Sequence, residues 1–125
     1  MANELSVSMS FTYEKGNVEE ISRTVSAKLV TVSGNRIFHH IQAIGFAAEE
    51  ALNLGELSSP FGWFWAKNLD DTNYVEIRFG TGASLDMVRL NAGEPCFFRL
   101  GSDITAPYAI ANTASVDLEY VIFPP

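Results

Sequence analysis

The feature that most constrains this chain is a period-two alternation of apolar and polar residues. In "LSVSMSFTY", residues 5–13, every odd position is apolar or aromatic and every even position is a serine or threonine. Side chains of a β-strand point alternately to its two faces, so this segment is expected to be a half-buried strand. "ISRTVSAKLVTV", residues 21–32, alternates too and is rich in β-branched residues, which favour strands. Its expected apolar face carries Ile21, Val25, Ala27 and Leu29.

Turn residues separate further strand-like segments at short intervals. "RIFHHIQAIGF" (36–46) follows the turn "SGN", and six shorter segments follow Pro60: 62–69, 74–79, 85–90, 94–100, 108–111 and 115–123. About nine strands at a spacing of about 10–12 residues are typical of an antiparallel sandwich or barrel. We expect an all-β fold, a jelly-roll-like antiparallel β-sandwich, as a single domain over residues 1–125. Residues 1–4 are a candidate flexible arm.

One segment resembles a helix more than a strand. Residues 47–57, "AAEEALNLGEL", contain good helix formers, but these are confined to the short piece 47–52, which Gly45 and Gly55 bracket. Such a piece is marginal as a helix. We therefore expect a connection or an edge strand here.

Composition excludes several classes of partner. The net charge is −7, and the eight Lys and Arg residues are scattered along the chain. Binding to a nucleic-acid backbone or to an anionic membrane needs a basic patch, so neither partner is expected. The first residues lack the pattern of a signal peptide, and no stretch approaches the length of a membrane span, so we expect a soluble chain made in a cytoplasm. The single cysteine, Cys96, is expected to be a small buried apolar residue.

Residues that could support catalysis or metal binding do not form a recognisable set. His39 and His40 are neighbours in a strand and should point to opposite faces, so they would not share a metal ion. No spacing suggests a nucleophile beside a base. We therefore expect neither enzymatic activity nor a cofactor or metal. Asp70 and Asp71 lie in "NLDDTN", which predicts a turn, with calcium binding left open.

The aromatic stretch "PFGWFWAKNLDDTNYVEIRF", residues 60–79, is the main candidate for an interaction site. It is expected to form one hairpin, in which Trp63 and Trp65 share a face and Phe61 continues it unless Gly62 bends the strand. Beyond the turn, Tyr74 and Arg78 lie on the more polar face. The candidate interface or ligand residues are Phe61, Trp63, Trp65, Tyr74 and Arg78. The tryptophan face is interpreted as core, as a subunit interface or as a platform for sugar rings.

The second half of the chain resembles a known class of protein. "GWFWAKNLDDTNYVEIRF" is followed by "VRLNAGEPCFFRL" and then by "YAIANTASVDLEYVIF". This order, over roughly residues 61–123, resembles small virion proteins encoded among the head and tail genes of tailed bacteriophages. Among these, an all-β chain of this size is most similar to a capsid decoration, or cement, protein.

The resemblance implies a structural role without catalytic residues. Cement proteins are β-sandwich or jelly-roll subunits that assemble as trimers on the capsid. The expected partners are the chain itself, as a homotrimer, and the phage major capsid protein or another virion protein. The expected location is the virion, after synthesis in the cytoplasm of the bacterial host. The alternatives are a small tail or baseplate component, or a carbohydrate-binding β-sandwich module for host recognition.

Overall fold

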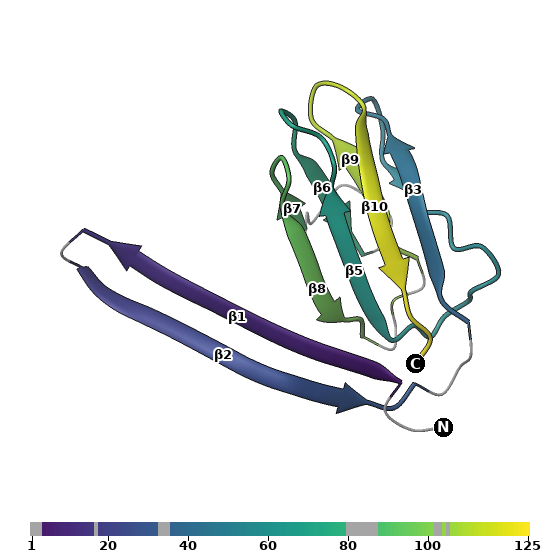
Figure 1. Cartoon of the computed structure of the whole chain (residues 1–125). Helices are drawn as coiled ribbons and strands as arrows, with labels where there is room; N and C mark the ends of the chain where they lie inside the picture. Colours follow the sequence, from purple (N-terminus) through teal and green to yellow (C-terminus); the bar gives the residue numbers. More distant parts are fainter. Residues whose placement is uncertain (1–3, 17, 33–35, 80–87, 102–103, 105) are drawn as a thin grey trace. The chain divides into compact units, whose positions relative to one another are not determined.

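The fold was analysed in a computed structural model, which describes residues 4–16, 18–32, 36–79, 88–101, 104 and 106–125 (Figure 1). The described residues form ten β-strands and no helix. The all-β expectation is therefore confirmed. The expected arm, residues 1–4, lies outside the described residues except for Glu4, whose carboxylate accepts a hydrogen bond from the Val32 amide at 3.2 Å.

The chain divides into two compact units, Met1–Ser33 and Gly34–Pro125. The sequence predicts one sandwich domain over residues 1–125. In the structure the first two strands form a sheet of their own, and the sandwich is built from the remaining eight.

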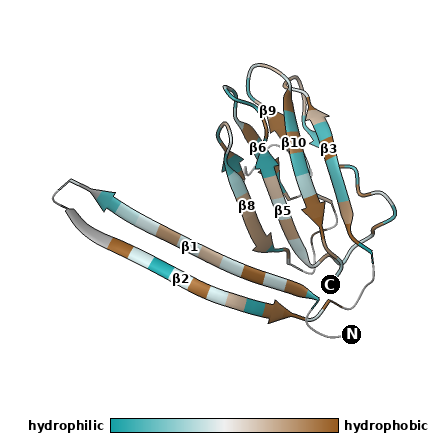
Figure 2. Cartoon of the chain, viewed as in Figure 1, coloured by the Kyte–Doolittle hydropathy of each residue, from teal (hydrophilic) through white to brown (hydrophobic). Residues whose placement is uncertain are grey.

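The first unit is a long two-stranded antiparallel hairpin of β1 (Leu5–Lys15) and β2 (Val18–Val30). Its alternating hydropathy is visible in Figure 2. The register shifts between Val7 and Met9, because Val7 pairs with Lys28 whereas Met9 pairs with Val25. This bulge adds one residue to β2, so the alternation of side chains between the two faces of β2 shifts by one residue there. Leu29 therefore pairs with Ser6 and lies on the hydroxyl face, which corrects the expected grouping of Leu29 with Ile21 and Val25.

The second unit is a sandwich of two four-stranded antiparallel sheets, ordered β3-β10-β5-β8 and β4-β9-β6-β7. We call them the β5 sheet and the β6 sheet. The strands of the β5 sheet are β3 (Phe38–Ile44), β10 (Val116–Ile122), β5 (Trp63–Asn68) and β8 (Pro95–Arg99). Those of the β6 sheet are β4 (Glu50–Ala51), β9 (Tyr108–Ala111), β6 (Val75–Arg78) and β7 (Val88–Leu90). The short edge strand β4 occupies the helix-like segment, as one of the two expectations had it.

The strand pairing is nested. The last strand pairs with the first of the sandwich, β10 with β3, and the pairs β9 with β4, β8 with β5 and β7 with β6 follow inward. Successive strands change sheet at every connection except β6 to β7. The strands β3 to β10 thus have the connectivity of one long hairpin that is folded across two layers, and strands far apart in sequence become neighbours.

This topology overturns the expected hairpin of residues 60–79. The strand β5 pairs with β10 and β8, whereas β6 pairs with β7 and β9 in the other sheet. The turn at Asp70 and Asp71 is real, but it carries the chain from one layer to the other. Local sequence predicts the turn, whereas strand pairing depends on partners elsewhere in the chain.

The inner faces of the two sheets enclose one hydrophobic core. Phe64, Tyr120 and Ile77 are fully buried, and the rings of Phe64 and Tyr120 stack with centroids 6.4 Å apart. Phe98 and Phe79 pack edge-on beside them, with centroids 5.6 Å apart. Alternate residues of each strand belong to this core, so the core decides which side chains point outward.

Asn68 is a fully buried polar residue that ties three segments together at the end of β5. Its side-chain amide donates hydrogen bonds to the carbonyls of Asn73 (2.8 Å) and Leu90 (3.0 Å). Its side-chain oxygen accepts a hydrogen bond from the Asp70 amide at 2.9 Å. The crossover from β5 to β6 is thereby fixed to the end of β7.

Replacing Asn68 with alanine is expected to lower the free energy of unfolding by about 2–4 kcal/mol, because buried backbone groups lose their partners. The measurement is urea unfolding followed by tryptophan fluorescence. Lys67→Ala is the matched control, since Lys67 is the exposed neighbour on the same strand and should change stability by less than about 0.5 kcal/mol. Equal unfolding midpoints for the two variants would contradict the role of Asn68.

Candidate functional site

The structure does not bring the five candidate residues of the aromatic stretch together. Phe61 is buried in the core with 3% of its surface exposed. Trp63 and Trp65 alternate with the buried Phe64, so they lie on the outer face of the β5 sheet. Tyr74 and Arg78 lie on the outer face of the β6 sheet, on the other side of the sandwich. The stretch therefore contributes to two opposite surfaces, and the tryptophan pair is not part of the sandwich core.

Gly62 explains why Phe61 leaves the tryptophan face. Its amide donates to the Phe123 carbonyl at 2.8 Å, and its carbonyl accepts from the Leu100 amide at 2.9 Å. A Cβ atom at this position would overlap the carbonyl oxygen of Pro124. The chain needs glycine for this close approach, and beyond it the Phe61 side chain enters the core.

The outer face of the β5 sheet carries a row of partly buried aromatic rings, which we call the aromatic row: Trp63, Trp65, Phe97 and Phe123. The Phe97 ring lies 5.0 Å from Trp63 and 6.4 Å from Phe123, centroid to centroid. The Arg99 guanidinium lies 5.2 Å from the centre of the Trp63 ring. The buried Trp63 Nε1 has no hydrogen-bond acceptor among the described residues. Such a row suits contact with another surface better than an open ligand groove.

The outer face of the β6 sheet carries charged groups that have partners. The Arg89 guanidinium lies 3.5 Å from the centre of the Tyr74 ring, a close cation–π contact. Arg78 donates to the Glu49 carboxylate at 3.0 Å, with both side chains largely covered. Tyr74 and Arg78 therefore already have contacts within the sandwich. Sequence reasoning missed Glu49 and Arg89, which are distant from these two residues along the chain.

The hairpin presents a large exposed apolar surface, which we call the hairpin apolar face: Met9, Phe11, Tyr13, Ile21 and Val25. Their exposed fractions are 47%, 56%, 49%, 43% and 52%. The register places Met9 opposite Val25 and Tyr13 opposite Ile21, so these side chains share one side of the ribbon. The expectation that residues 5–13 form a half-buried strand is therefore wrong from Met9 to Tyr13, because alternation decides which side chains share a face but not whether another layer covers them.

The polar residues considered for chemistry have structural roles. His39 points outward and lies 2.7 Å from a Glu119 carboxylate oxygen, whereas His40 packs against Phe38 and Tyr120. The two histidines therefore face opposite sides, as expected. Among the described residues no group of three or more His, Cys, Asp or Glu side chains is placed to hold a metal ion.

The turn at Asp70 is closed by hydrogen bonds between its own residues. The Asp70 carboxylate accepts hydrogen bonds from the amides of Asn73 (2.5 Å) and Thr72 (2.9 Å), which lower its pKa. The same carboxylate oxygen serves both amides and closes the turn locally. This arrangement explains why Asp and Asn cluster here without requiring a cation.

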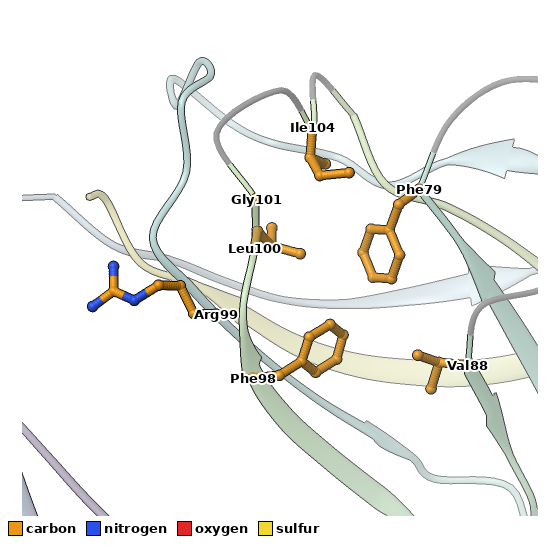
Figure 3. A pocket seen from close by; sticks show the side chains of 7 residues that line it. All are labelled: Phe79, Val88, Phe98, Arg99, Leu100, Gly101 and Ile104. Atoms are coloured by element: carbon orange, nitrogen blue, oxygen red, sulfur yellow. The ribbon is translucent and has the colours of Figure 1, made fainter.

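A shallow pocket of about 390 Å³ opens between the ends of β6, β7 and β8 (Figure 3). Phe79, Val88 and Phe98 form its apolar wall, and the only charged group in its described lining, Arg99, points away from the hollow. The described lining of this pocket contains no nucleophile beside a base.

Cys96 is expected to react slowly in the folded protein. Burial raises the pKa of its thiol from 9.0 to about 11, so less thiolate is present at any pH below that value. At pH 8 alkylation by iodoacetamide should be about a hundredfold slower in the native chain than in urea. The native rate should keep rising up to about pH 11, whereas the rate of the unfolded chain levels off near pH 9. A native rate that also levels off near pH 9 would refute this, and Cys96→Ser gives the background.

No protein-family model, curated protein or solved structure matches the chain. In the described part of the chain no helix is long and apolar enough to cross a membrane. A functional conclusion therefore depends on the geometry of the hairpin apolar face and of the aromatic row.

Proposed function

We propose that this chain is a non-enzymatic structural protein of a tailed-bacteriophage virion, most specifically a capsid decoration protein. It would stabilise the shell by burying surface against several shell subunits. In this proposal the partners are further copies of the chain, as a trimer, and the major capsid protein. The expected location is the virion.

The observation that carries the proposal is the exposure of the hairpin apolar face. Five large side chains each keep roughly half of their surface in water. Fully burying one such side chain contributes about 1.5–3 kcal/mol, so covering the exposed halves would contribute about 4–7 kcal/mol. That gain is comparable to the whole stability of a small domain. An assembly partner provides it, whereas an enzyme or a small-ligand module has no need of such a surface.

The sandwich topology also supports the proposal. Nested pairing of eight strands in two sheets is the arrangement expected of a jelly roll, an architecture used in viral capsid proteins. We propose that the sandwich is a jelly roll in this sense. Architecture alone does not specify function, so this point adds to the hairpin without replacing it.

Two other functions are alternatives to the capsid role. A tail or baseplate component would use the same surfaces within another part of the virion. A carbohydrate-binding module is favoured by one observation, the outward placement of Trp63 and Trp65 on one sheet. Against it, the Trp63 ring is already packed by Phe97 and Arg99, which leaves less of it to stack on a sugar.

The proposal predicts that the protein binds expanded shells of the major capsid protein from the same genome and raises their melting temperature. Co-sedimentation and differential scanning calorimetry of the shells would measure both effects. Replacing Phe11 and Tyr13 together with serine should weaken binding at least tenfold, because their rings would no longer be buried at the contact. Ser10→Ala with Thr12→Ala, on the hydroxyl face of β1, is the matched control and should bind normally.

Three outcomes would count against the capsid role. A chain that leaves shell melting unchanged would overturn it, and co-sedimentation with purified tails instead would assign the tail alternative. Glycan-array binding that is lost in Trp65→Ala would favour the carbohydrate module.

A further inference from the structure

Between Leu5 and Tyr13 the free edge of β1 lacks the features that normally protect an exposed strand, and the charged residues of β1, Glu14 and Lys15, come only at its end. In the described part of the chain β1 pairs only with β2. Natural edge strands are guarded by charged residues, proline or bulges, because their unpaired amides and carbonyls otherwise recruit another strand. From Leu5 to Tyr13 β1 has no charged residue and no proline.

The irregularities of the hairpin lie on the other strand. Both register shifts, between Val7 and Met9 and between Tyr13 and Lys15, come from an extra residue in β2. The described charges Arg23 and Lys28 also lie on β2. Bulges bend the strand that carries them, so β1 keeps the regular backbone that strand addition requires. We therefore expect an incoming strand to pair with the edge of β1 and not with that of β2.

The sequence of β1 is self-complementary about Met9. If two copies of β1 run antiparallel with Met9 opposite Met9, then Val7 faces Phe11 and Leu5 faces Tyr13. On the other face Ser8 meets Ser10, and Ser6 meets Thr12. Between Leu5 and Tyr13 each apolar residue thus meets an apolar residue and each hydroxyl meets a hydroxyl, pairings that stabilise antiparallel strands. The same register sets Glu4 opposite Glu14 at both ends, a like-charge pair that opposes the contact there. A charged or irregular partner strand would not match this pattern.

We propose that β1 pairs with β1 of a second copy of the chain, antiparallel and centred on Met9. The product is a four-stranded sheet in the order β2-β1-β1-β2. A twofold axis perpendicular to that sheet keeps the hairpin apolar faces of both copies on the same side. A two-stranded hairpin alone is marginal in water, and independent stability requires three or more strands with a shared apolar face. The second copy thereby supplies the additional strands that each hairpin lacks.

This contact joins chains in pairs because a twofold interface uses the same patch on both partners. A closed trimer would leave at least one of its three hairpins unpaired, so in a trimeric assembly the β1 contact would link two trimers. The inference rests on the proposed function only in treating the hairpin as an assembly surface. It does not require that the assembly be a capsid.

Disulfide trapping tests the register in the full chain, with Cys96→Ala as background. Met9→Cys should form a disulfide-linked dimer under mild oxidation, because residue 9 lies opposite itself within disulfide reach. Thr12→Cys is the control, since its two copies would lie about 20 Å apart. Mixing Val7→Cys with Phe11→Cys should give the mixed dimer and little of either homodimer. Equal cross-linking of Met9→Cys and Thr12→Cys would overturn the proposed register.

A charge test measures the contact without a covalent bond. Met9→Lys places two ammonium groups opposite each other at the twofold axis and should halve the mass of the assembly by light scattering. Val25→Lys is the matched control, because Val25 is the partner of Met9 on β2, is equally exposed and lies away from the axis. A wild-type chain that stays monomeric, or an unchanged mass for Met9→Lys, would overturn the proposal. Circular dichroism verifies that both variants keep the sandwich.

The two proposals fail in different ways. Chains that do not cross-link at position 9 but still bind shells would overturn the β1 pairing and leave the capsid role standing. Chains that cross-link in the predicted register but ignore shells would do the reverse. Hydrogen-exchange protection of β1 amides that appears only after shell protein is added would assign the β1 edge to that protein and overturn self-pairing.

Discussion

Close packing between the inner faces of two four-stranded sheets is the interaction on which the rest of this structure depends. Phe64, Tyr120 and Ile77 lie at its centre without exposure to solvent. Because alternate residues of a strand point to opposite faces, burying Phe64 inward places Trp63 and Trp65 outward on the β5 sheet. The aromatic row is thus a consequence of core packing, and so is the separation of Trp65 from Tyr74 and Arg78.

The side chains of the hairpin alternate in the same way, but its apolar face is not buried as the sandwich core is. The side chains of β1 from Leu5 to Tyr13 sort into an apolar and a hydroxyl face, yet Phe11 on this strand and Val25 on β2 remain more than half exposed. A strand pair has no second layer to close over such a face, so its apolar surface and the free edge of β1 remain available for other chains. The sandwich buries its inner faces within one chain, whereas we propose that the hairpin apolar face is covered by assembly with other chains.

Much of the fold could be predicted locally, and the misses share one cause. Strand positions, the turn at Asp70 and the opposite orientation of His39 and His40 all follow from residue type and period two. The pairing of residues 60–79 as one hairpin was wrong because β5 finds β8 and β10 as better neighbours in a shared layer. Leu29 changed faces because a bulge, set by pairing with β1, shifts the parity of β2.

The sequence by itself determined that the chain is all-β, where most strands begin and end, and, away from the bulge in β2 and from Phe61, which side chains share a face, because these properties depend on spacing along the backbone. The candidate residues Phe61, Trp63, Trp65, Tyr74 and Arg78 were also identified from the sequence, but not their dispersal to a core and two opposite surfaces. Only the tertiary structure decided which faces are covered. Burial depends on which distant strands share a layer, and no local pattern in residues 5–13 distinguishes a strand that packs into a sandwich from one whose apolar side chains stay exposed.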